Sequence, residues 1–187
     1  NGQPPAVESA AGAPWWKVGC QGNENCSNTR SVWLLVKGNY VNAANFVCPS
    51  GSQGQIPRLE SSQVQNYNDF PGRKYITYSF RIRCSMREDG KLLCRKVLMA
   101  DLSPLFEKLP DDYSQSFRLH LNPKLLTLNS INHRRRGQNV LFGDGRVEFL
   151  KTRHTGISKD DIFTLQDTDI YQGCEVPSCE TDFFLAP

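Results

Sequence analysis

The sequence lacks a long hydrophobic run, because no stretch approaches the roughly 20 consecutive apolar residues that a transmembrane helix needs. It also lacks the apolar centre of a secretory signal peptide, so we expect a soluble chain from which any export signal or anchor has been removed. The sequence also lacks a strong excess of charge of either sign, since 22 Lys and Arg against 19 Asp and Glu leave a formal net charge of +3. So weak a bias gives no reason to expect a nucleic-acid partner.

Catalytic motifs are missing as well. The three histidines, His120, His133 and His154, do not stand in a Gly-x-Ser-x-Gly or His-Glu-x-x-His context. The sequence has no glycine-rich phosphate loop, and Cys48, which is followed by Pro49, has no recognisable activating base. We therefore expect a protein that is not an enzyme.

Cysteine, by contrast, is plentiful, with seven residues that mostly lie close to another cysteine in the sequence. There is no Cys-x-x-Cys and no His-x-x-x-His, which argues against a zinc ribbon and against covalently attached haem. Disulfides formed in an oxidising compartment are the favoured interpretation, and they leave Cys48 unpaired or bridged to another chain. The expected pairs are Cys20–Cys26, Cys84–Cys94 and Cys174–Cys179.

The length of the chain suits one domain with tails. Residues 1–14 are rich in Gly, Ala and Pro and predict a flexible lead-in. Residues 15–171 form the expected globular domain, and residues 172–187 a tail closed by a disulfide. The adjacent Trp15 and Trp16 are expected to anchor the lead-in onto the domain, with a partner-binding surface as the alternative.

Two segments of the N-terminal half differ in pattern. Residues 28–37 predict a short helix, with Ser27 and Asn28 as candidate N-caps and Gly38 as its stop. Residues 50–72 are polar and show little periodicity, so they predict a long surface loop.

Residues 75–83 alternate apolar and polar side chains, which predicts a strand with one buried and one solvated face. A turn at residues 88–90 connects this strand to a second strand at residues 97–100. In the expected register, opposed cysteines lie close enough for a cross-strand disulfide. This register pairs Phe80 with Leu98 and Cys84 with Cys94.

Residues 139–150 predict a β-hairpin, because two apolar runs flank Gly143-Asp144-Gly145. In the favoured interpretation Asp144 shapes the turn, both glycines supply a positive φ, and His133 braces the turn. The alternative is that His133 and Asp144 hydrogen-bond or share a metal, as in a metal-dependent hydrolase.

The segment from Asn129 to Phe149 resembles the C-terminal region of bacterial pseudopilin-like proteins with a prepilin-type N-terminus. That family is known for a His followed by nine residues and Asp-Gly; here ten residues separate His133 from Asp144, and Asn139 and Gly145 belong to the same motif. With other segments that agree in order, the resemblance covers roughly residues 26–165. These segments are Asn28-Thr29-Arg30 with Leu34-Leu35, Phe46-Val47-Cys48-Pro49-Ser50, Tyr75-Ile76-Thr77-Tyr78 and Met99-Ala100-Asp101-Leu102-Ser103-Pro104.

The resemblance implies an α+β fold, a β-rich pilin-like head with an antiparallel sheet and a few short helices. The hydrophobic N-terminal pilin helix of the family is absent from this chain. The implied function is a non-catalytic assembly subunit of an exported filament, of a type II secretion apparatus or of a larger periplasmic or otherwise extracytoplasmic complex. Its partners are other protein subunits, in homo- or hetero-oligomers, and it reaches a membrane only through the missing helix. A secreted module that binds a ligand through Trp15, Trp16 and the 50–72 loop is the alternative.

Two sets of charged side chains complete the candidate sites. One set is expected to cap a helix and face solvent, with Ca²⁺ binding as the alternative, because major pseudopilins hold calcium in a C-terminal loop. The other set is expected to be a solvated charge run, with a docking patch for an acidic partner as the alternative. No cofactor other than calcium is suggested. The acidic set is Asp160, Asp161, Asp167 and Asp169, and the basic set is Arg134, Arg135 and Arg136.

Overall fold

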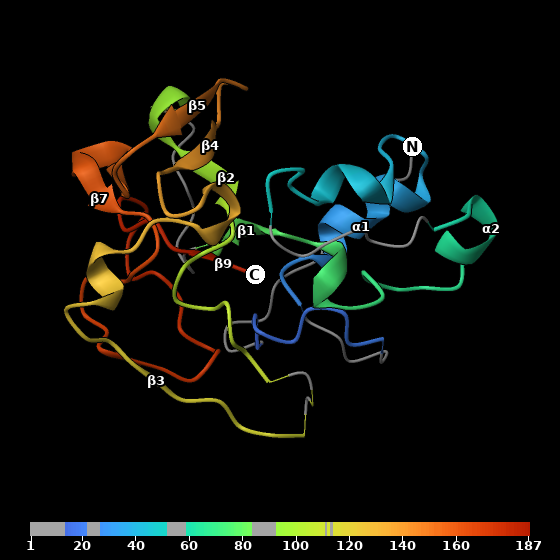
Figure 1. Ribbon diagram of the computed structural model, residues 1–187, viewed down its shortest axis with the longest axis horizontal. Helices are drawn as coiled ribbons and strands as arrows, with labels where there is room; N and C mark the ends of the chain where they lie inside the picture. The colour runs from blue at the N-terminus through green and yellow to red at the C-terminus, as the bar shows by residue number, and fades with distance from the viewer. Residues whose placement is uncertain (1–13, 22–26, 52–58, 84–92, 111, 113) are drawn as a thin grey trace.

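The computed structural model describes residues 14–21, 27–51, 59–83, 93–110, 112 and 114–187. An antiparallel sheet of five strands lies at its centre, in the order β5-β4-β2-β1-β9 (Figure 1). The α+β class, the antiparallel sheet and the short helices are confirmed. The strands of this sheet are β1 (Tyr78–Arg81), β2 (Val97–Asp101), β4 (Gln138–Phe142), β5 (Val147–Leu150) and β9 (Leu185–Ala186).

The remaining elements are short. Two pairs of strands form small antiparallel sheets: β3 (Leu119–His120) with β8 (Ile170–Tyr171), and β6 (His154–Thr155) with β7 (Asp160–Asp161). The α-helices are α1 (Arg30–Lys37) and α2 (Ser61–Val64). The 3₁₀ turns are η1 (Ala43–Phe46), η2 (Arg73–Tyr75), η3 (Leu93–Arg95), η4 (Leu125–Thr127), η5 (Ile131–His133) and η6 (Ile157–Lys159). Within the described ranges no helix has the length and apolar character to cross a bilayer.

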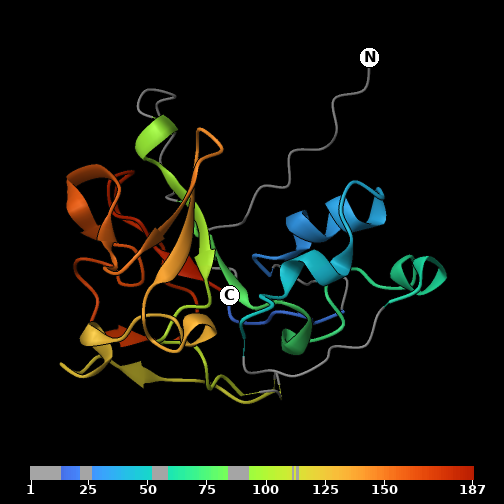
Figure 2. The same cartoon turned by 45° about the horizontal axis from the view of Figure 1, so that its top comes forward.

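Two hydrophobic clusters fill the interior. The sheet cluster includes Trp15, Trp16, Val140, Phe163 and Phe184, and the helix cluster includes Val18, Trp33, Phe46, Phe70 and Phe80. Figures 1 and 2 show α1 and α2 on one side of the molecule and β4 and β5 on the other. Strand β1 joins the two sides, because Phe80 belongs to the helix cluster and Ile82, just beyond the strand, to the sheet cluster.

Trp15 and Trp16 anchor the start of the described chain. Both rings are buried, and Trp15 packs edge-on against Phe106 at a centroid distance of 4.6 Å. The Trp15 amide donates to the Gly173 carbonyl at 2.9 Å. Gly173 has a φ of +99°, and a Cβ there would overlap the Trp16 ring. Anchoring is therefore confirmed, and the two tryptophans do not form a ligand or partner surface. Residues 1–13 lie outside the described ranges.

The predicted boundary at residue 172 is wrong. Phe183, Phe184, Leu185 and Ala186 are fully buried, and β9 pairs with β1 inside the main sheet. The apolar run at the end of the chain completes the core, so residues 172–187 belong to the domain.

The disulfide expected to close that segment is not formed. Cys174 and Cys179 are free thiols in the structure, and the segment is held by its buried side chains. Cys26 lies outside the described residues, so a bridge to Cys20 stays a prediction.

Helix α1 begins at Arg30 and ends before Gly38, two residues later than expected at its start. Its N-cap is Thr29 and neither of the expected residues, Ser27 and Asn28. The Ser27 hydroxyl instead donates to the carboxylate of Asp69. Asp69 is fully buried and also accepts from the Thr29 hydroxyl at 2.9 Å. The prediction of a surface loop over residues 50–72 is therefore wrong at Asp69, which organises the turn before α1, and at the short helix α2.

The β1–β2 register differs from the predicted one by one residue. Phe80 lies opposite Met99, and Cys94 lies on η3 before the second strand begins. A shift of one residue exchanges the two faces of a strand, so the geometric argument for a Cys84–Cys94 bridge is wrong. Cys94 is a free thiol, and Cys84 lies outside the described residues.

The prediction that one face of β1 is exposed to solvent is also wrong. Thr77 and Ser79 are fully buried, where their hydroxyl oxygens accept backbone amide protons. The backbone amide of Cys48 donates to Thr77 Oγ1 at 2.6 Å, and the backbone amide of Ser103 donates to Ser79 Oγ at 2.8 Å. Loops therefore cover the face that the alternation assigned to water.

The hairpin of β4 and β5 is confirmed, with Gln138 opposite Leu150 and Leu141 opposite Val147. Asp144 shapes its turn as expected, since its Oδ1 accepts the Arg146 amide at 3.0 Å. Only one of the two glycines has a positive φ, Gly145 at +86°.

Candidate functional site

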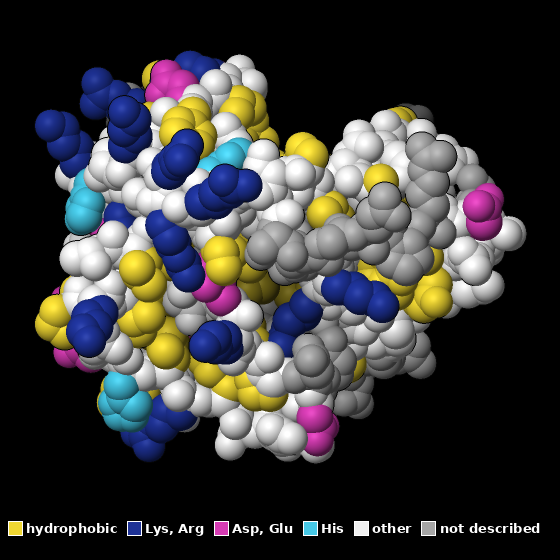
Figure 3. Space-filling model, viewed as in Figure 1, with side chains coloured by type: hydrophobic (Ala, Val, Ile, Leu, Met, Phe, Trp, Pro, Cys, Tyr) yellow, Lys and Arg dark blue, Asp and Glu magenta, His cyan; other side chains and the backbone are white. Residues whose placement is uncertain are grey.

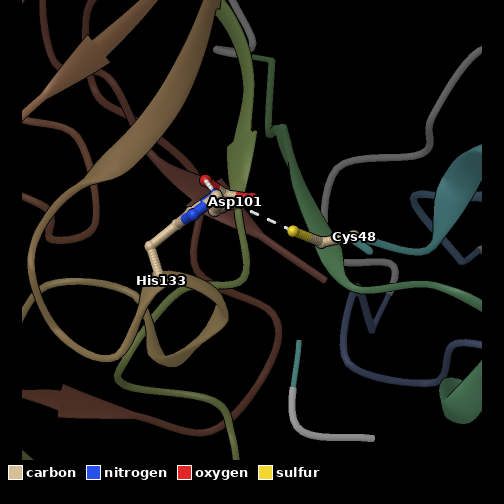
Figure 4. A group of neighbouring side chains, drawn as sticks. All are labelled: Cys48, Asp101 and His133. Carbon is tan, nitrogen blue, oxygen red and sulfur yellow. Dashed lines mark hydrogen bonds and ion pairs between the residues drawn. The ribbon is translucent and has the colours of Figure 1, made fainter. Parts of the chain in front are cut away.

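Three side chains with metal-ligating atoms meet between the two clusters (Figure 4). Cys48 follows η1, Asp101 ends β2 and His133 ends η5. The Nε2 atom of His133 lies 3.7 Å from Cys48 Sγ and 3.1 Å from Asp101 Oδ2. The described part of the chain holds no other group of three Cys, His, Asp or Glu side chains this close together.

Asp101 provides the negative charge of the site. Its carboxylate is fully buried and accepts from Asn132 Nδ2 at 3.0 Å and from the Asn139 amide at 2.6 Å. Asn139 Nδ2 adds a third donor at 3.2 Å. Among the described residues its ion-pair partner is the His133 imidazole, with no Lys or Arg in contact. A buried carboxylate is therefore held mainly by neutral amides.

Cys48 is a free, buried thiol, in agreement with its expected unpaired state. Its backbone is fixed by the Thr77 hydroxyl at 2.6 Å. Burial raises the pKa of this thiol, and the Asp101 carboxylate raises it further. The neighbouring Tyr78 has a pKa raised to about 12, first by burial and then by Cys48 and Asp101. At neutral pH both groups are protonated.

His133 is positioned by a sharp reversal of the chain. Ser130 caps η5 by accepting the Asn132 amide, and Arg134 and Arg135 follow in the left-handed region, at φ of 53° and 62°. The imidazole packs edge-on against Phe149 at a centroid distance of 5.3 Å. Its side chain is 21% exposed, so it connects the buried pair to solvent.

The arrangement differs from a nucleophile–base–acid relay. In such a relay the nucleophile contacts one ring nitrogen of the histidine and the carboxylate contacts the other. Here Cys48 Sγ, Asp101 Oδ2 and Asn139 Nδ2 all face the single atom Nε2 of His133. A protonated thiol beside a carboxylate is also a poor nucleophile. The geometry favours a shared point of coordination.

The structure separates His133 from Asp144. His133 contacts Asn139 at the base of the hairpin, whereas Asp144 lies in the turn at its tip. Asp144 lies five residues beyond Asn139, and at the rise of an extended chain five steps span about 16 Å. The interpretations that His133 braces the turn, or forms a hydrolase site with Asp144, are therefore wrong.

The other charged candidates lie elsewhere. Asp161 is engaged by Arg153 Nε at 2.7 Å, and Asp160 accepts the Phe183 amide at 2.6 Å. These two residues form β7 instead of opening a helix. Within the described ranges the four predicted aspartates Asp160, Asp161, Asp167 and Asp169 do not converge on one point.

The arginine run is divided between two roles. Arg135 forms a bidentate ion pair with Glu107, with both N–O distances at 2.6 Å. Arg134 and Arg136 are exposed. The run is therefore partly structural and only partly a solvated charge.

Comparison of the chain with protein-family models, with curated proteins and with solved structures finds no match. Sequence reasoning identified His133 and Asn139 but missed Asp101 as a site residue and set Cys48 aside. Each of these residues stands in one of the segments that carry the pseudopilin resemblance. Their common place in these segments was the one sequence feature that could have grouped them as a site, since no short motif links residues so far apart in the sequence.

Proposed function

We propose that this protein is a non-catalytic assembly subunit of an exported protein complex, as the resemblance to pseudopilin-like heads implies. The observation that carries the proposal is the edge strand β5. It is the outermost strand of the main sheet, and its side chains Val147 and Phe149 are 61% and 47% exposed. The extracytoplasmic location rests on the resemblance alone.

An exposed edge strand offers unpaired backbone groups to another chain. The opposite edge, β9, is fully buried, so β5 is the accessible edge of this sheet. Adding a strand there supplies main-chain hydrogen bonds, while pockets or apolar contacts at alternate residues supply specificity. Val147 and Phe149 are two positions apart and therefore face the same side.

Basic side chains lie next to this edge. Arg134, Arg136 and Lys151 are exposed, and Asn129 Nδ2 bridges the carbonyls of Arg135 and Lys151 at 3.5 and 3.1 Å. Figure 3 shows Lys and Arg side chains gathered over the part of the molecule that holds β4 and β5. The matching partner is a protein strand with acidic side chains beside an apolar pair.

The proposal is tested by placing a charge on the edge strand. Native size-exclusion chromatography of extracts from producing cells should show the wild-type chain in a complex of defined stoichiometry. Phe149→Lys should shift the chain to the monomer volume. Leu34→Lys, at a 55% exposed site on α1, is the matched control and should stay in the complex. A monomeric wild-type chain, or a Phe149→Lys chain that remains assembled, contradicts the proposal.

A further inference from the structure

We propose that Cys48, Asp101 and His133 form a zinc site that joins the helix cluster to the sheet cluster. The inference goes beyond an assembly function and does not depend on it. The three residues supply one sulfur, one oxygen and one nitrogen, the donor set that zinc accepts in proteins.

The distances between the ligand atoms suit a tetrahedral ion. Zinc bonds of about 2.3 Å to sulfur and about 2.0 Å to nitrogen and oxygen place S and N about 3.5 Å apart, and N and O about 3.3 Å apart. The observed separations from His133 Nε2 are 3.7 Å to Cys48 Sγ and 3.1 Å to Asp101 Oδ2. These two separations lie within about 0.2 Å of the tetrahedral values, and all three ligand atoms lie within 4.8 Å of one another. The fourth position is left to a water molecule.

The charges of the pocket are compatible with a bound cation. The Asp101 carboxylate is fully buried, and it contacts the His133 imidazole and neutral amides, with no Lys or Arg among the described residues paired with it. A buried charge is costly unless it is paired or bound to a metal. Zinc binding would replace the thiol proton of Cys48, which is released to solvent, and would leave a thiolate and a carboxylate around the dication.

The surrounding hydrogen bonds resemble the outer shell of a metal site. Asn132 Nδ2 holds the far oxygen of Asp101 at 3.0 Å and also donates to the Thr77 carbonyl at 2.7 Å. The Thr77 hydroxyl in turn fixes the backbone of Cys48. Outer-shell bonds of this kind orient ligands before the metal arrives. The partly exposed His133 provides the entry path.

The location gives the ion a structural role. Cys48 lies two residues after Phe46, a member of the helix cluster, and Asp101 follows Ala100, a member of the sheet cluster. An ion bound to both segments would link the two halves of the interior beside β1.

Titration with Co²⁺ and Zn²⁺ tests the site. The reduced wild-type chain should bind one equivalent of Co²⁺, with the visible bands of a tetrahedral ion and a near-ultraviolet thiolate band. Cys48→Ser should lose the thiolate band, and His133→Gln should weaken binding by at least tenfold. The matched controls are Cys94→Ser and His154→Gln, which change an exposed thiol and an exposed imidazole and should leave the titration unchanged.

Thermal unfolding gives a second readout. Zinc at a hundredfold excess over its Kd should raise the Tm of the wild-type chain by roughly 5–10 °C. The shift should disappear in Cys48→Ser, whose near-ultraviolet circular dichroism shows whether the fold is kept. Absence of binding by the folded wild-type chain, or identical titrations for wild type and Cys48→Ser, overturns the proposal. These measurements use the isolated chain, so they fail or succeed independently of assembly.

Discussion

The carboxylate of Asp182 is buried beside Asp160, and its Oδ1 atom has no hydrogen-bond partner among the described residues. Burial, followed by repulsion from Asp160, raises the pKa of Asp182 from 3.8 to about 6. The folded chain therefore binds this proton more tightly than the unfolded chain does. The free energy of unfolding should rise as the pH falls from 7 through 6, with the gain complete below about pH 4 for this group.

Replacing this carboxylate by an amide removes the cost of burying its charge. Asp182→Asn should raise the free energy of unfolding at pH 7 by about 1–2 kcal/mol and flatten its dependence between pH 7 and 5. Urea denaturation at the two pH values measures both effects. Asp169→Asn, at an exposed site, should stay within about 0.5 kcal/mol of wild type. A less stable Asp182→Asn chain with an unchanged pH profile would show that the buried charge is not destabilising.

At the scale of elements, the final strand β9 carries more of the core than its length suggests. Leu185 is a fully buried member of the sheet cluster and pairs with Arg81 of β1, whereas Val176 in the same C-terminal segment is exposed. Leu185→Ala should lower the free energy of unfolding by about 2–5 kcal/mol. Val176→Ala should lower it by less than about 1 kcal/mol. Chemical denaturation measures both changes. Equal losses of unfolding free energy in the two variants would show that residues 172–187 are a loosely attached tail.

The elements that were predicted correctly from the sequence are those whose structure depends on residues close together in the chain. The β4–β5 hairpin follows from a turn with Asp144 and Gly145 between apolar runs, and α1 from a short apolar period that stops at Gly38. The β1–β2 register was missed because it depends on how both faces of β1 pack. Thr77 and Ser79 look like a solvated face in the sequence, yet loops from residues 48 and 103 bury them.

The candidate site escaped sequence analysis for a related reason. Cys48, Asp101 and His133 come from three segments that meet only when β2 pairs with β4 and the loop after η1 folds over β1. No spacing rule connects them. His133 was assigned to Asp144, its neighbour in the motif, because a sequence cannot show that a five-residue strand carries the two residues apart.

For the whole molecule, the main question is whether the two hydrophobic clusters unfold together. They share β1, whose Phe80 packs in the helix cluster while Ile82, one residue beyond the strand, packs in the sheet cluster. The site at Cys48 and Asp101 adds a second connection. Interiors joined by a continuous strand and by buried polar contacts are expected to unfold as one cooperative unit.

The three tryptophans report on this cooperativity separately, because Trp33 lies in the helix cluster and Trp15 and Trp16 in the sheet cluster. Trp33→Phe leaves fluorescence from the sheet cluster alone, and Trp15→Phe/Trp16→Phe leaves it from the helix cluster alone. In each variant the fluorescence midpoint in urea should coincide with the midpoint by far-ultraviolet circular dichroism, since one transition gives the same curve to every probe. Comparing two probes within a variant removes the stability cost of the substitution itself. A Trp33 signal that changes at lower urea than the circular dichroism would show that the helix cluster opens first, and that β1 does not couple the two halves.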